Sequence, residues 1–495
     1  MGAPAFPFDT VLIANRGEIA LRILRTVKAL GLRGAVVYHA LDAEGPAVAA
    51  ADVAVEIHGP TPVAAYLDGA QIIAAARQAG AGAVHPGYGF LSENAGFARA
   101  CADAGLTFVG PAPQTMELMG DKVRARRFVA EHGFPVAPSA VEDDDPQTFL
   151  DRARALGAPL LIKPSAGGGG KGMRIVRDMA NLADEAARAR SEGQRFFGDG
   201  RLYVERYVEQ PRHIEVQVLG DAHGSLVHLH ERECSVQRRF QKVIEESPSP
   251  ALSAEQRHSI CEVARGIAAT AGYVNAGTIE FIWGNGDFYF LEMNTRLQVE
   301  HPVTEMVTGL DLVELQLRIA AGEPLPFRQD EVTPRGHAIE LRLYAEAPAR
   351  DFAPTTGRVH VLALPEAEGL RIDCGVMEGQ AITTAFDPML AKVVAHGGDR
   401  DGAIAILAAA LKQLALLGCE TNATFLGRVL ADTGFRSGAV HTGYLDGNAA
   451  LTAEPPLGTE QLRAILAAAA LASRTVTDAA DAVPPLHGVI GGWRN

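Results

Sequence analysis

Residues 277–294 read GTIEFIWGNGDFYFLEMN, two apolar and aromatic runs on either side of the turn signal GNGD. This pattern predicts a β-hairpin. A three-residue loop over 285–287 pairs Gly284 with Phe288 and therefore Glu280 with Glu292. A two-residue Asn-Gly turn would put the two glutamates on opposite faces. We predict the three-residue loop because it gathers the apolar side chains on one face: Ile279, Phe281, Trp283, Tyr289, Leu291 and Met293.

The predicted register makes Glu280 and Glu292 direct neighbours across the hairpin. Like charges in such a pair are destabilising unless a cation neutralises them. Asn294 lies two residues further along the same face. Two carboxylates and an amide oxygen suit Mg²⁺ whose remaining ligands come from nucleotide phosphates. A solvated acidic strand face is the alternative.

A glycine-rich segment precedes this hairpin. Residues 162–176 read IKPSAGGGGKGMRIV, with four consecutive glycines between two β-like runs. Backbone N–H groups in such a loop are free to wrap a phosphate, which Lys163 and Lys171 would neutralise. The loop is not a Walker A motif, because Ser165 and Gly172 stand where that motif has glycine and a hydroxyl residue. The alternative is a flexible hairpin, and the short helices and strands around it suggest a lid.

The first hundred residues alternate between predicted strands and helices. Strands are expected at 10–15, 34–38, 83–87 and 107–110, and helices at 18–31, 69–80 and 95–105. This order predicts a parallel α/β sheet. The G-x-G-x-x-G fingerprint is absent from IANRGEI, so a structural domain without its own nucleotide is favoured. Residues 336–445 are predicted to form another α/β unit.

Bulk properties limit the classes of protein. The chain has 495 residues, enough for several domains, and a net charge of -14, which argues against nucleic acid as a partner. Its five cysteines are scattered and never spaced as C-x-x-C, which predicts reduced thiols. No apolar run is long enough to span a membrane. These features predict a cytoplasmic enzyme.

Two further segments carry polar side chains. Residues 231–246, ERECSVQRRFQKVIEE, include Lys242 and two arginines that would bind anions or form a solvated basic edge. Residues 85–94, HPGYGFLSEN, place Tyr88 at the end of a predicted strand, where ligands of α/β sheets gather. Cys234 has no nearby histidine partner in the sequence and is interpreted as a packing residue.

From Val11 to Leu445 the chain resembles the biotin carboxylase component of biotin-dependent acyl-CoA carboxylases, in the ATP-grasp superfamily. The matching strings include IANRGEIALRILR, VHPGYGFLSEN, IKPSAGGGGKGM, FLEMNTRLQVEHPVTE and GHAIELRLYAE. The resemblance implies a Rossmann-like domain over 1–120 and an ATP-grasp domain over 121–335 with a mobile lid at about 138–208. A biotin carboxylase C-terminal domain over 336–446 and a helix and linker tail over 447–495 would follow.

The resemblance also implies a reaction and its residues. ATP would phosphorylate bicarbonate to carboxyphosphate, and the carboxyl group would pass to biotin on a carrier. Mg²⁺ or Mn²⁺ would be held by Glu280, Glu292 and Asn294. The ATP site would consist of Lys122, Lys163, Gly167, Gly168, Gly169, Gly170, Met173, Glu205, Val208, His213, Gln237, Glu280 and Glu292.

The catalytic residues follow from the same resemblance. Glu300 would deprotonate bicarbonate, which Arg296, Lys242 and the backbone of Val299 would hold. Arg342 would stabilise the enolate form of biotin. Tyr88 would lie near the biotin ring, with Asp387 as a weaker candidate. His301 is expected to fix the turn before Pro302.

The sequence departs from the family pattern at two positions of the nucleotide site. QRRFQK has Phe240 where the family has a histidine, and Arg206 stands where lysine is usual. Phe240 cannot donate a hydrogen bond, so weaker ATP binding is a hypothesis. The alternatives are another ATP-grasp ligase, or a nucleotide-binding scaffold with reduced turnover.

The expected partners are a biotin carboxyl carrier domain and a carboxyltransferase subunit. Met-Lys-Met, the usual biotin acceptor, does not occur in the sequence, and the ending GGWRN resembles the segment that follows biotin carboxylase in α subunits. A piece of a longer α subunit and a stand-alone subunit are both compatible with this. The family often dimerises through the first helix, where Arg22 and Arg25 lie, so a homodimer and a monomer stay open. No nucleic acid or membrane partner is expected.

Overall fold

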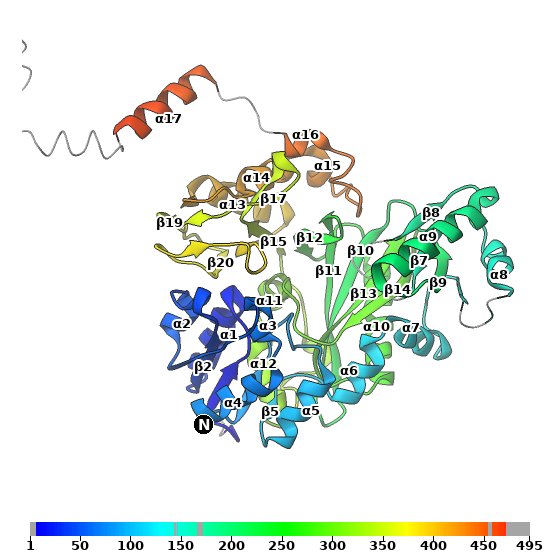
Figure 1. Cartoon of the computed structure of the whole chain (residues 1–495), viewed down its shortest axis with the longest axis horizontal. Coiled ribbons are helices and arrows are strands. Elements are labelled where there is room, and N and C mark those ends of the chain that lie inside the picture. The colour runs from blue at the N-terminus through cyan, green and yellow to red at the C-terminus, as the bar shows by residue number, and fades with distance from the viewer. Residues whose placement is uncertain (1–5, 143–144, 146, 166–171, 454–457, 472–495) are drawn as a thin grey trace, which may run out of the picture. The chain divides into compact units, whose positions relative to one another are not determined.

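A computed structural model describes residues 6–142, 145, 147–165, 172–453 and 458–471 of the chain (Figure 1). Internal contacts divide the chain into residues 1–451 and 452–495. The described part of the second unit contains helix α17, Thr459–Leu471. Among the described residues, no helix combines the length and the apolar character that crossing a bilayer requires.

The N-terminal part is the predicted parallel α/β sheet. Its strands are β1 (Thr10–Ile13), β2 (Arg33–Tyr38), β3 (Val53–Glu56), β4 (Ala83–His85) and β5 (Thr107–Phe108), in the order β3-β2-β1-β4-β5. Helices α1 (Gly17–Ala29), α4 (Gly69–Ala79) and α5 (Ala95–Asp103) were predicted. Strand β3 was missed, because it is a half-exposed edge strand of only four residues, too short to show a clear alternation.

A small subdomain follows the first sheet, as the lid prediction expected. Its sheet has the order β6-β9-β7-β8, with β6 at Ser139–Val141, β7 at Leu160–Pro164, β8 at Arg174–Val176 and β9 at Leu202–Arg206. Helices α8 (Phe149–Ala155) and α9 (Leu182–Phe197) share its apolar core. The four glycines 167–170 lie outside the described residues.

The hairpin of β13 (Asn275–Gly284) and β14 (Asp287–Asn294) has the predicted Glu280–Glu292 pair but a different turn. Gly284 pairs with Asp287, so the loop has two residues and the predicted three-residue loop is wrong. The register shifts between Glu280 and Phe281, where Leu291 is the extra residue of a β-bulge that restores the glutamate pair. Consequently Phe290, and neither Tyr289 nor Leu291, joins the buried core with Ile279, Phe281 and Met293.

The hairpin is one edge of an eight-stranded sheet with the order β14-β13-β10-β11-β12-β15-β22-β20. The other strands are β10 (Arg212–Gly220), β11 (Leu226–Arg238), β12 (Gln241–Ser247), β15 (His337–Tyr344), β20 (Leu370–Cys374) and β22 (Met389–Gly397). Strand β12 pairs antiparallel with β15, so the sheet continues across the predicted domain boundary at 335/336. The strands β15, β22 and β20 are therefore part of this antiparallel sheet and do not form a separate one.

Helices cover the sheet and join it to the N-terminal part. Helix α10 (Ala254–Thr270) packs on β10 and β11, while α13 (Arg400–Gln413) packs on β15 and β22. The other helices are α2 (Pro46–Ala50), α3 (Pro62–Tyr66), α6 (Pro113–Gly120), α7 (Lys122–Glu131), α11 (His301–Thr308), α12 (Leu312–Ala320), α14 (Ala423–Ala431), α15 (Thr433–Arg436) and α16 (Ala449–Thr452). Short two-stranded pairs complete this region. They are β16 (Glu346–Ala347) with β17 (Ala353–Pro354), β18 (Gly357–Arg358) with β21 (Ala381–Ile382), and β19 (Val361–Ala363) with β23 (Ala415–Leu417).

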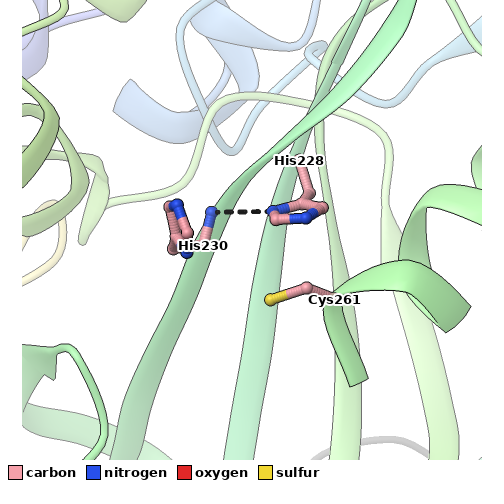
Figure 2. A group of neighbouring side chains, drawn as sticks. All are labelled: His228, His230 and Cys261. Atoms are coloured by element: carbon pink, nitrogen blue, oxygen red, sulfur yellow. Dashed lines mark hydrogen bonds between the residues drawn. The ribbon is translucent and has the colours of Figure 1, made fainter. Parts of the chain in front are cut away.

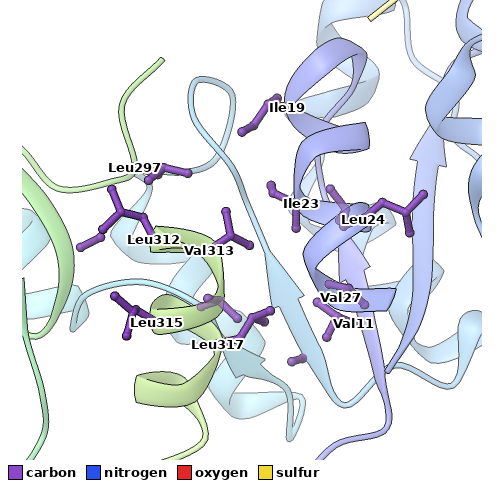
Figure 3. Packing of buried hydrophobic residues seen from close by; sticks show 14 of the residues in the cluster. Val11, Ile19, Ile23, Leu24, Val27, Leu297, Leu312, Val313, Leu315 and Leu317 are labelled. Carbon is purple, nitrogen blue, oxygen red and sulfur yellow. The ribbon is translucent and has the colours of Figure 1, made fainter. Parts of the chain in front are cut away.

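One apolar cluster fastens α1 to α12 (Figure 3). Ile23 and Val27 of α1 face Val313 and Leu317 of α12. Leu297, fully buried, belongs to the same cluster. Because Leu297 lies in the connection between β14 and α11, the N-terminal core anchors the segment that carries the predicted catalytic residues.

Candidate active site

A row of charged side chains crosses four neighbouring strands of the large sheet. Arg232 on β11 lies opposite Glu215 on β10, Glu215 opposite Glu280 on β13, and Glu280 opposite Glu292 on β14. Carboxylates that are direct cross-strand neighbours repel one another unless cations neutralise them. Arg232 is fully buried, and its Nε lies 2.5 Å from Glu215 Oε1.

Lys242, on β12, supplies the central positive charge. Its Nζ lies 2.5 Å from Glu215 Oε2, 3.0 Å from Glu280 Oε1 and 2.5 Å from Glu300 Oε1. Burial alone would lower the pKa of Lys242, but the carboxylates raise it well above its usual range. Burial likewise works against ionisation of Glu280, yet Lys242 and His213 hold the pKa of that carboxyl well below its usual range. Both groups are therefore charged at neutral pH.

Glu300 lies between two cations from different strands. Its carboxylate contacts Lys242 through Oε1 and the Arg342 guanidinium through Oε2, the second at 3.0 Å. Arg342, on β15, also donates from Nε to Glu245 Oε1 at 2.6 Å. Burial would raise the pKa of Glu300, but the two cations outweigh it and lower that pKa. The predicted catalytic residues Lys242, Glu300 and Arg342 thus form one contact network.

Arg296 belongs to the edge of this network. Its Nε donates to Glu93 Oε2 and its Nη2 to Asn294 Oδ1, both at 2.9 Å. Asn294 in turn donates from Nδ2 to Glu280 Oε1 at 3.0 Å. Within the described residues, Arg296 therefore reaches Glu280 through Asn294, with no direct contact to Lys242.

The predicted metal ligands have the chemistry of a hard cation site. Glu280 and Glu292 are cross-strand partners, and Asn294 contacts Glu280. Glu292 Oε2 lies 2.6 Å from Lys122 Nζ, and Glu280 contacts Lys242 and Gln298. The side chains fit Mg²⁺ by their oxygen donors, and a bound ion would replace part of these contacts.

The other predicted ATP residues fall into two groups. On the lid, Lys163 Nζ lies 2.5 Å from Glu205 Oε1, and the Tyr203 hydroxyl donates to Glu205 Oε2 at 2.7 Å. On the large sheet, His213 lies 2.8 Å from Gln237 Nε2 and 3.0 Å from Glu280 Oε2.

Four further predicted or divergent nucleotide-site residues lie apart from these pairs. Met173 and Val208 are half-buried, and Gly167–Gly170 are not among the described residues. Arg206 is exposed and donates to the backbone oxygen of Leu156. Phe240 is 61% exposed at the tip of the β11–β12 hairpin, where it and Arg239 both have positive φ.

A cavity of about 500 Å³ opens beside Arg342. The predicted biotin residues Tyr88 and Arg342, the weaker candidate Asp387, and Val299 all line it. The Tyr88 hydroxyl donates to Glu18, and burial raises its pKa well above the usual range. The structure therefore brings these predicted residues to one cavity next to Glu300.

The sequence reasoning missed several charged residues of this region. Glu215, Arg232, Glu245, Glu93, Glu18 and Lys392 all contact predicted site residues or one another. In HIEVQVLG, Glu215 and Gln217 alternate with Ile214, Val216 and Val218, all of them buried. Polar side chains at alternate positions of a strand that is buried on both faces could have marked Glu215 as a site residue from the sequence.

Cys234 and His301, both predicted to have structural roles, are fully buried. Burial raises the pKa of Cys234 well above the usual range, so it is a neutral thiol as the packing interpretation requires. The Nδ1 of His301 lies 2.8 Å from the Gln298 backbone oxygen. This contact spans the turn before Pro302.

A sheet with a row of buried carboxylates, next to a small four-stranded subdomain with its own Lys–Glu pair, is the architecture of the ATP-grasp class. Residues 121–328 match the family described as carbamoyl-phosphate synthase L chain, ATP binding domain. Residues 7–116 match the biotin carboxylase N-terminal domain, and residues 340–447 match the biotin carboxylase C-terminal domain. The chain belongs to the biotin carboxylase family, and the predicted three-part fold is confirmed.

Curated relatives differ in length. Biotin carboxylase of Halalkalibacterium halodurans is 47% identical over 440 residues, which cover 88% of this chain and 97% of that protein. The mitochondrial α subunits of methylcrotonoyl-CoA carboxylase from Oryza sativa subsp. japonica and Arabidopsis thaliana are each 45% identical. The alignments cover 94% and 88% of this chain but 65% and 60% of those subunits, so the chain spans less than two thirds of their length.

Solved structures give the same fold. The biotin carboxylase domain of Hydrogenobacter thermophilus 2-oxoglutarate carboxylase has a TM-score of 0.85 and 40% identity, covering 92% of this chain and all of that one. It is described as a dimer in complex with MgADP, ADP and bicarbonate. Biotin carboxylase from Campylobacter jejuni, in complex with β-γ-ATP, has a TM-score of 0.84 and 40% identity, covering 89% of this chain and 99% of that one.

Proposed function

We propose that this chain carboxylates biotin on a carrier protein, with ATP and bicarbonate as co-substrates and carboxyphosphate as the intermediate. The observation that carries the proposal is the position of Glu300, a buried carboxylate between Lys242 and Arg342 beside the cavity lined by Tyr88. The names of the relatives and the bicarbonate and ADP bound to a similar domain support it.

In the first step Glu300 takes the proton of bicarbonate. An oxygen of the resulting dianion attacks the γ-phosphorus of ATP, the bond to the bridging oxygen breaks, and ADP leaves. Phosphoryl transfer depends mainly on positioning and charge neutralisation. Lys122, Lys163 and His213 would bind the nucleotide, and Mg²⁺ held by Glu280, Glu292 and Asn294 would neutralise phosphate charge.

The basicity of Glu300 depends on the anion that binds beside it. Without substrate, Lys242 and Arg342 lower its pKa, which makes it a weak base. Bicarbonate bound to Arg296, Lys242 and the Val299 backbone would share these cations and raise the pKa of Glu300. Substrate binding would thus activate its own general base.

In the second step carboxyphosphate breaks down to CO₂ and phosphate next to biotin. The phosphate accepts the N1′ proton of biotin, Arg342 stabilises the enolate oxygen of the ureido ring, and N1′ attacks CO₂. Carboxyphosphate is short-lived in water, so closure of the lid over residues 138–208 would protect it. Tyr88 and Asp387 line the cavity that would hold the biotin ring.

The whole assembly is part of the proposal. This chain would perform the first half-reaction of an acyl-CoA carboxylase, with a carrier domain and a carboxyltransferase as partners, as the names of the methylcrotonoyl-CoA carboxylase relatives suggest. A homodimer is supported by the described dimer of the similar domain. A cytoplasmic location is proposed from the five cysteines, all of them free thiols, although the plant relatives are mitochondrial by name.

The test measures ADP release by the purified chain with ATP and Mg²⁺. We expect release that depends on bicarbonate and rises with free biotin, and a loss of about 100-fold or more in Glu300→Gln. Glu246→Gln is the matched control. Glu246, on β12, is a buried glutamate like Glu300, but it contacts His337 and Arg400 away from the cavity. If ATP binds and biotin does not stimulate ADP release, the nucleotide-binding scaffold is the better assignment.

A further inference from the structure

A second group of ligand-forming side chains lies between β11 and α10, apart from the carboxylate row. His228 and His230 project from β11, and the Cys261 sulfur points from α10 towards that strand (Figure 2). One ligand atom from each side chain lies within 4.8 Å of the other two. We propose that these residues bind a zinc ion.

His230 is arranged to present a lone pair. His230 Nε2 lies 3.2 Å from the Val332 backbone oxygen, a contact that places the ring proton on Nε2. Its Nδ1 is then an acceptor, and this buried atom has no hydrogen-bond partner among the described residues. An orienting carbonyl on one ring nitrogen and a free lone pair on the other is the usual state of a histidine ligand.

His228 is arranged differently. Its Nδ1 accepts a long hydrogen bond from the His230 backbone N–H at 3.4 Å, and its Nε2 lies 3.5 Å from Glu262 Oε1. A zinc ion on Nδ1 would replace this weak contact. Burial lowers the pKa of His228 to about 4, so the ring is neutral. Gln329 fixes the backbone of His228 on both sides, accepting from its N–H at 2.8 Å and donating to its C=O at 3.0 Å.

The local backbone brings the two rings together. The pairing of β10 with β11 shifts between Val216 and Val218, which leaves a bulge at residues 229–230. His230 has a φ of 65°, in the left-handed region. The rings approach edge to face with centroids 5.1 Å apart. In a regular strand, residues 228 and 230 would share a face about 6.8 Å apart, whereas here the bulge and the left-handed φ of His230 set the orientation of the two rings.

The third ligand is a fully buried cysteine. Burial raises the pKa of the Cys261 thiol well above its usual range, so the metal-free site holds S–H. Zinc would replace that proton: the S–H bond breaks, the Zn–S bond forms and one proton is released to solvent.

Two imidazoles and one thiolate match zinc, which is bound by nitrogen and sulfur in tetrahedral sites. Zn–N and Zn–S distances of about 2.0 and 2.3 Å bring ligand atoms to roughly 3.5 Å from one another. Because these atoms now lie within 4.8 Å of one another, they would approach by up to about 1.3 Å. Three protein ligands leave a fourth position for water. The ion would join α10 to β11. In the sheet, strand β12 separates β11 from β15.

The test uses the full chain, stripped with a chelator and titrated with Co²⁺ as a spectroscopic probe and with Zn²⁺ as competitor. We expect one equivalent of Co²⁺ with a thiolate-to-metal charge-transfer band and intense tetrahedral d–d bands, both abolished by Zn²⁺. Cys261→Ala and His230→Asn should lose the band. Asparagine is chosen because it tolerates positive φ. Cys101→Ala, which removes another fully buried thiol, should keep it.

A second measurement covers variants that fold poorly. Zn²⁺ should raise the Tm of the wild-type chain and of Cys101→Ala by a few degrees, and leave the Tm of His230→Asn unchanged. Absence of the band from the wild-type chain, or its persistence in Cys261→Ala, would overturn the proposal. Cobalt bound at the carboxylate row could give a thiolate band only through Cys234, whose sulfur lies within 4.8 Å of ligand oxygens of Glu215 and Glu300, and that band would persist in Cys261→Ala.

Discussion

Two buried carboxyl groups, Glu245 and Glu340, face each other across the β12–β15 pair. Both oxygens of Glu340 are buried without a hydrogen-bond partner in the part of the chain that the structure describes. Burial raises the pKa of Glu340 well above its usual range, and it raises that of Glu245, despite Arg342, to about 7. At neutral pH the pair therefore holds a proton that the unfolded chain would release.

This proton predicts an unusual dependence of stability on pH. A carboxyl group whose folded pKa is raised loses stability as pH rises from its unfolded pKa towards its folded pKa. Glu340→Gln removes this loss, so relative to the wild-type chain it should gain about 1 kcal/mol per pH unit between pH 5 and pH 7. Urea unfolding at pH 5, 6 and 7 would measure the difference.

Glu246 is the control for this prediction, because its pKa is lowered in the folded chain where that of Glu340 is raised. Burial would raise its pKa, but His337 and Arg400 lower it, so its contribution is present above the unfolded pKa and is lost as pH falls through the folded one. Glu246→Gln should therefore be most destabilising at pH 6 to 7 and least at pH 4. A Glu340→Gln difference that stays constant with pH would contradict the assignment of a raised pKa.

Phe240 is the residue at which nucleotide binding departs from the family pattern. Its ring is exposed, and it adopts a φ of 68°, which aromatic residues rarely do. Phe240→His should lower the KM for ATP because an imidazole can donate a hydrogen bond. Phe240→Asn is the control, since asparagine also tolerates the backbone but has no ring; an unchanged KM in the histidine variant would sink the hypothesis.

At the scale of elements, the hairpin turn makes a separate prediction. Asn285 and Gly286 have φ values of 57° and 89°, as a two-residue hairpin turn requires. A Cβ on Gly286 would meet no atom within 4 Å, so any cost of Gly286→Ala is conformational. We expect a loss of about 1 kcal/mol in unfolding free energy. Gly398→Ala, also in open space but without a positive φ, should be close to neutral by the same denaturation measurement.

The sequence was sufficient for elements with strong periodicity and insufficient where the backbone is irregular. Helices α1, α4 and α5 and strands β1, β2, β4 and β5 were predicted, as was the Glu280–Glu292 pair. The turn was wrong because a bulge at Leu291 compensates for a shorter loop, and bulges leave no clear mark in the apolar pattern. Strand β12 was missed because Arg239 and Phe240, between β11 and β12, resemble a charged loop.

The site was predicted less completely than the fold. Glu280 was predicted from the hairpin register and Lys242 from the basic segment 231–246, while Glu300 and Arg342 came from the family resemblance, and the structure brings the four into one contact network. The ion pairs that hold them, such as Arg232 with Glu215, join strands whose neighbours only the folded chain defines. The alternation around Glu215 could have marked that residue, but the distant cation that neutralises each carboxylate has no local sequence signal, so the pairings could not be predicted.

At the scale of the whole molecule, the continuous sheet predicts how the chain can be shortened. Residues 1–451 form one unit by internal contacts. A chain ending at Leu451 should keep the Tm and the biotin-stimulated ADP release of the full chain. A chain ending at Arg335 should misfold or aggregate, because β12 would become an unpaired edge and Ile244 would lose its neighbours on β15.

Circular dichroism, size-exclusion chromatography and the ADP assay would compare the three lengths. A well-folded chain ending at Arg335 would mean that the predicted boundary at 335/336 separates independent units despite the shared sheet. Loss of activity in the chain ending at Leu451 would instead assign a role to residues beyond it.

Lys392 has a consequence for building hybrid enzymes from relatives. This fully buried lysine of β22 donates to the Val299 backbone oxygen at 2.9 Å and lies 3.3 Å from Glu18 of α1. The segment that carries Glu300 is thus held by Lys392 of β22, which in turn contacts Glu18 of the first helix, α1. Domain exchange at the sequence boundaries would separate parts that have to be inherited together, so a functional chimera should take α1, residues 295–300 and β22 from a single parent.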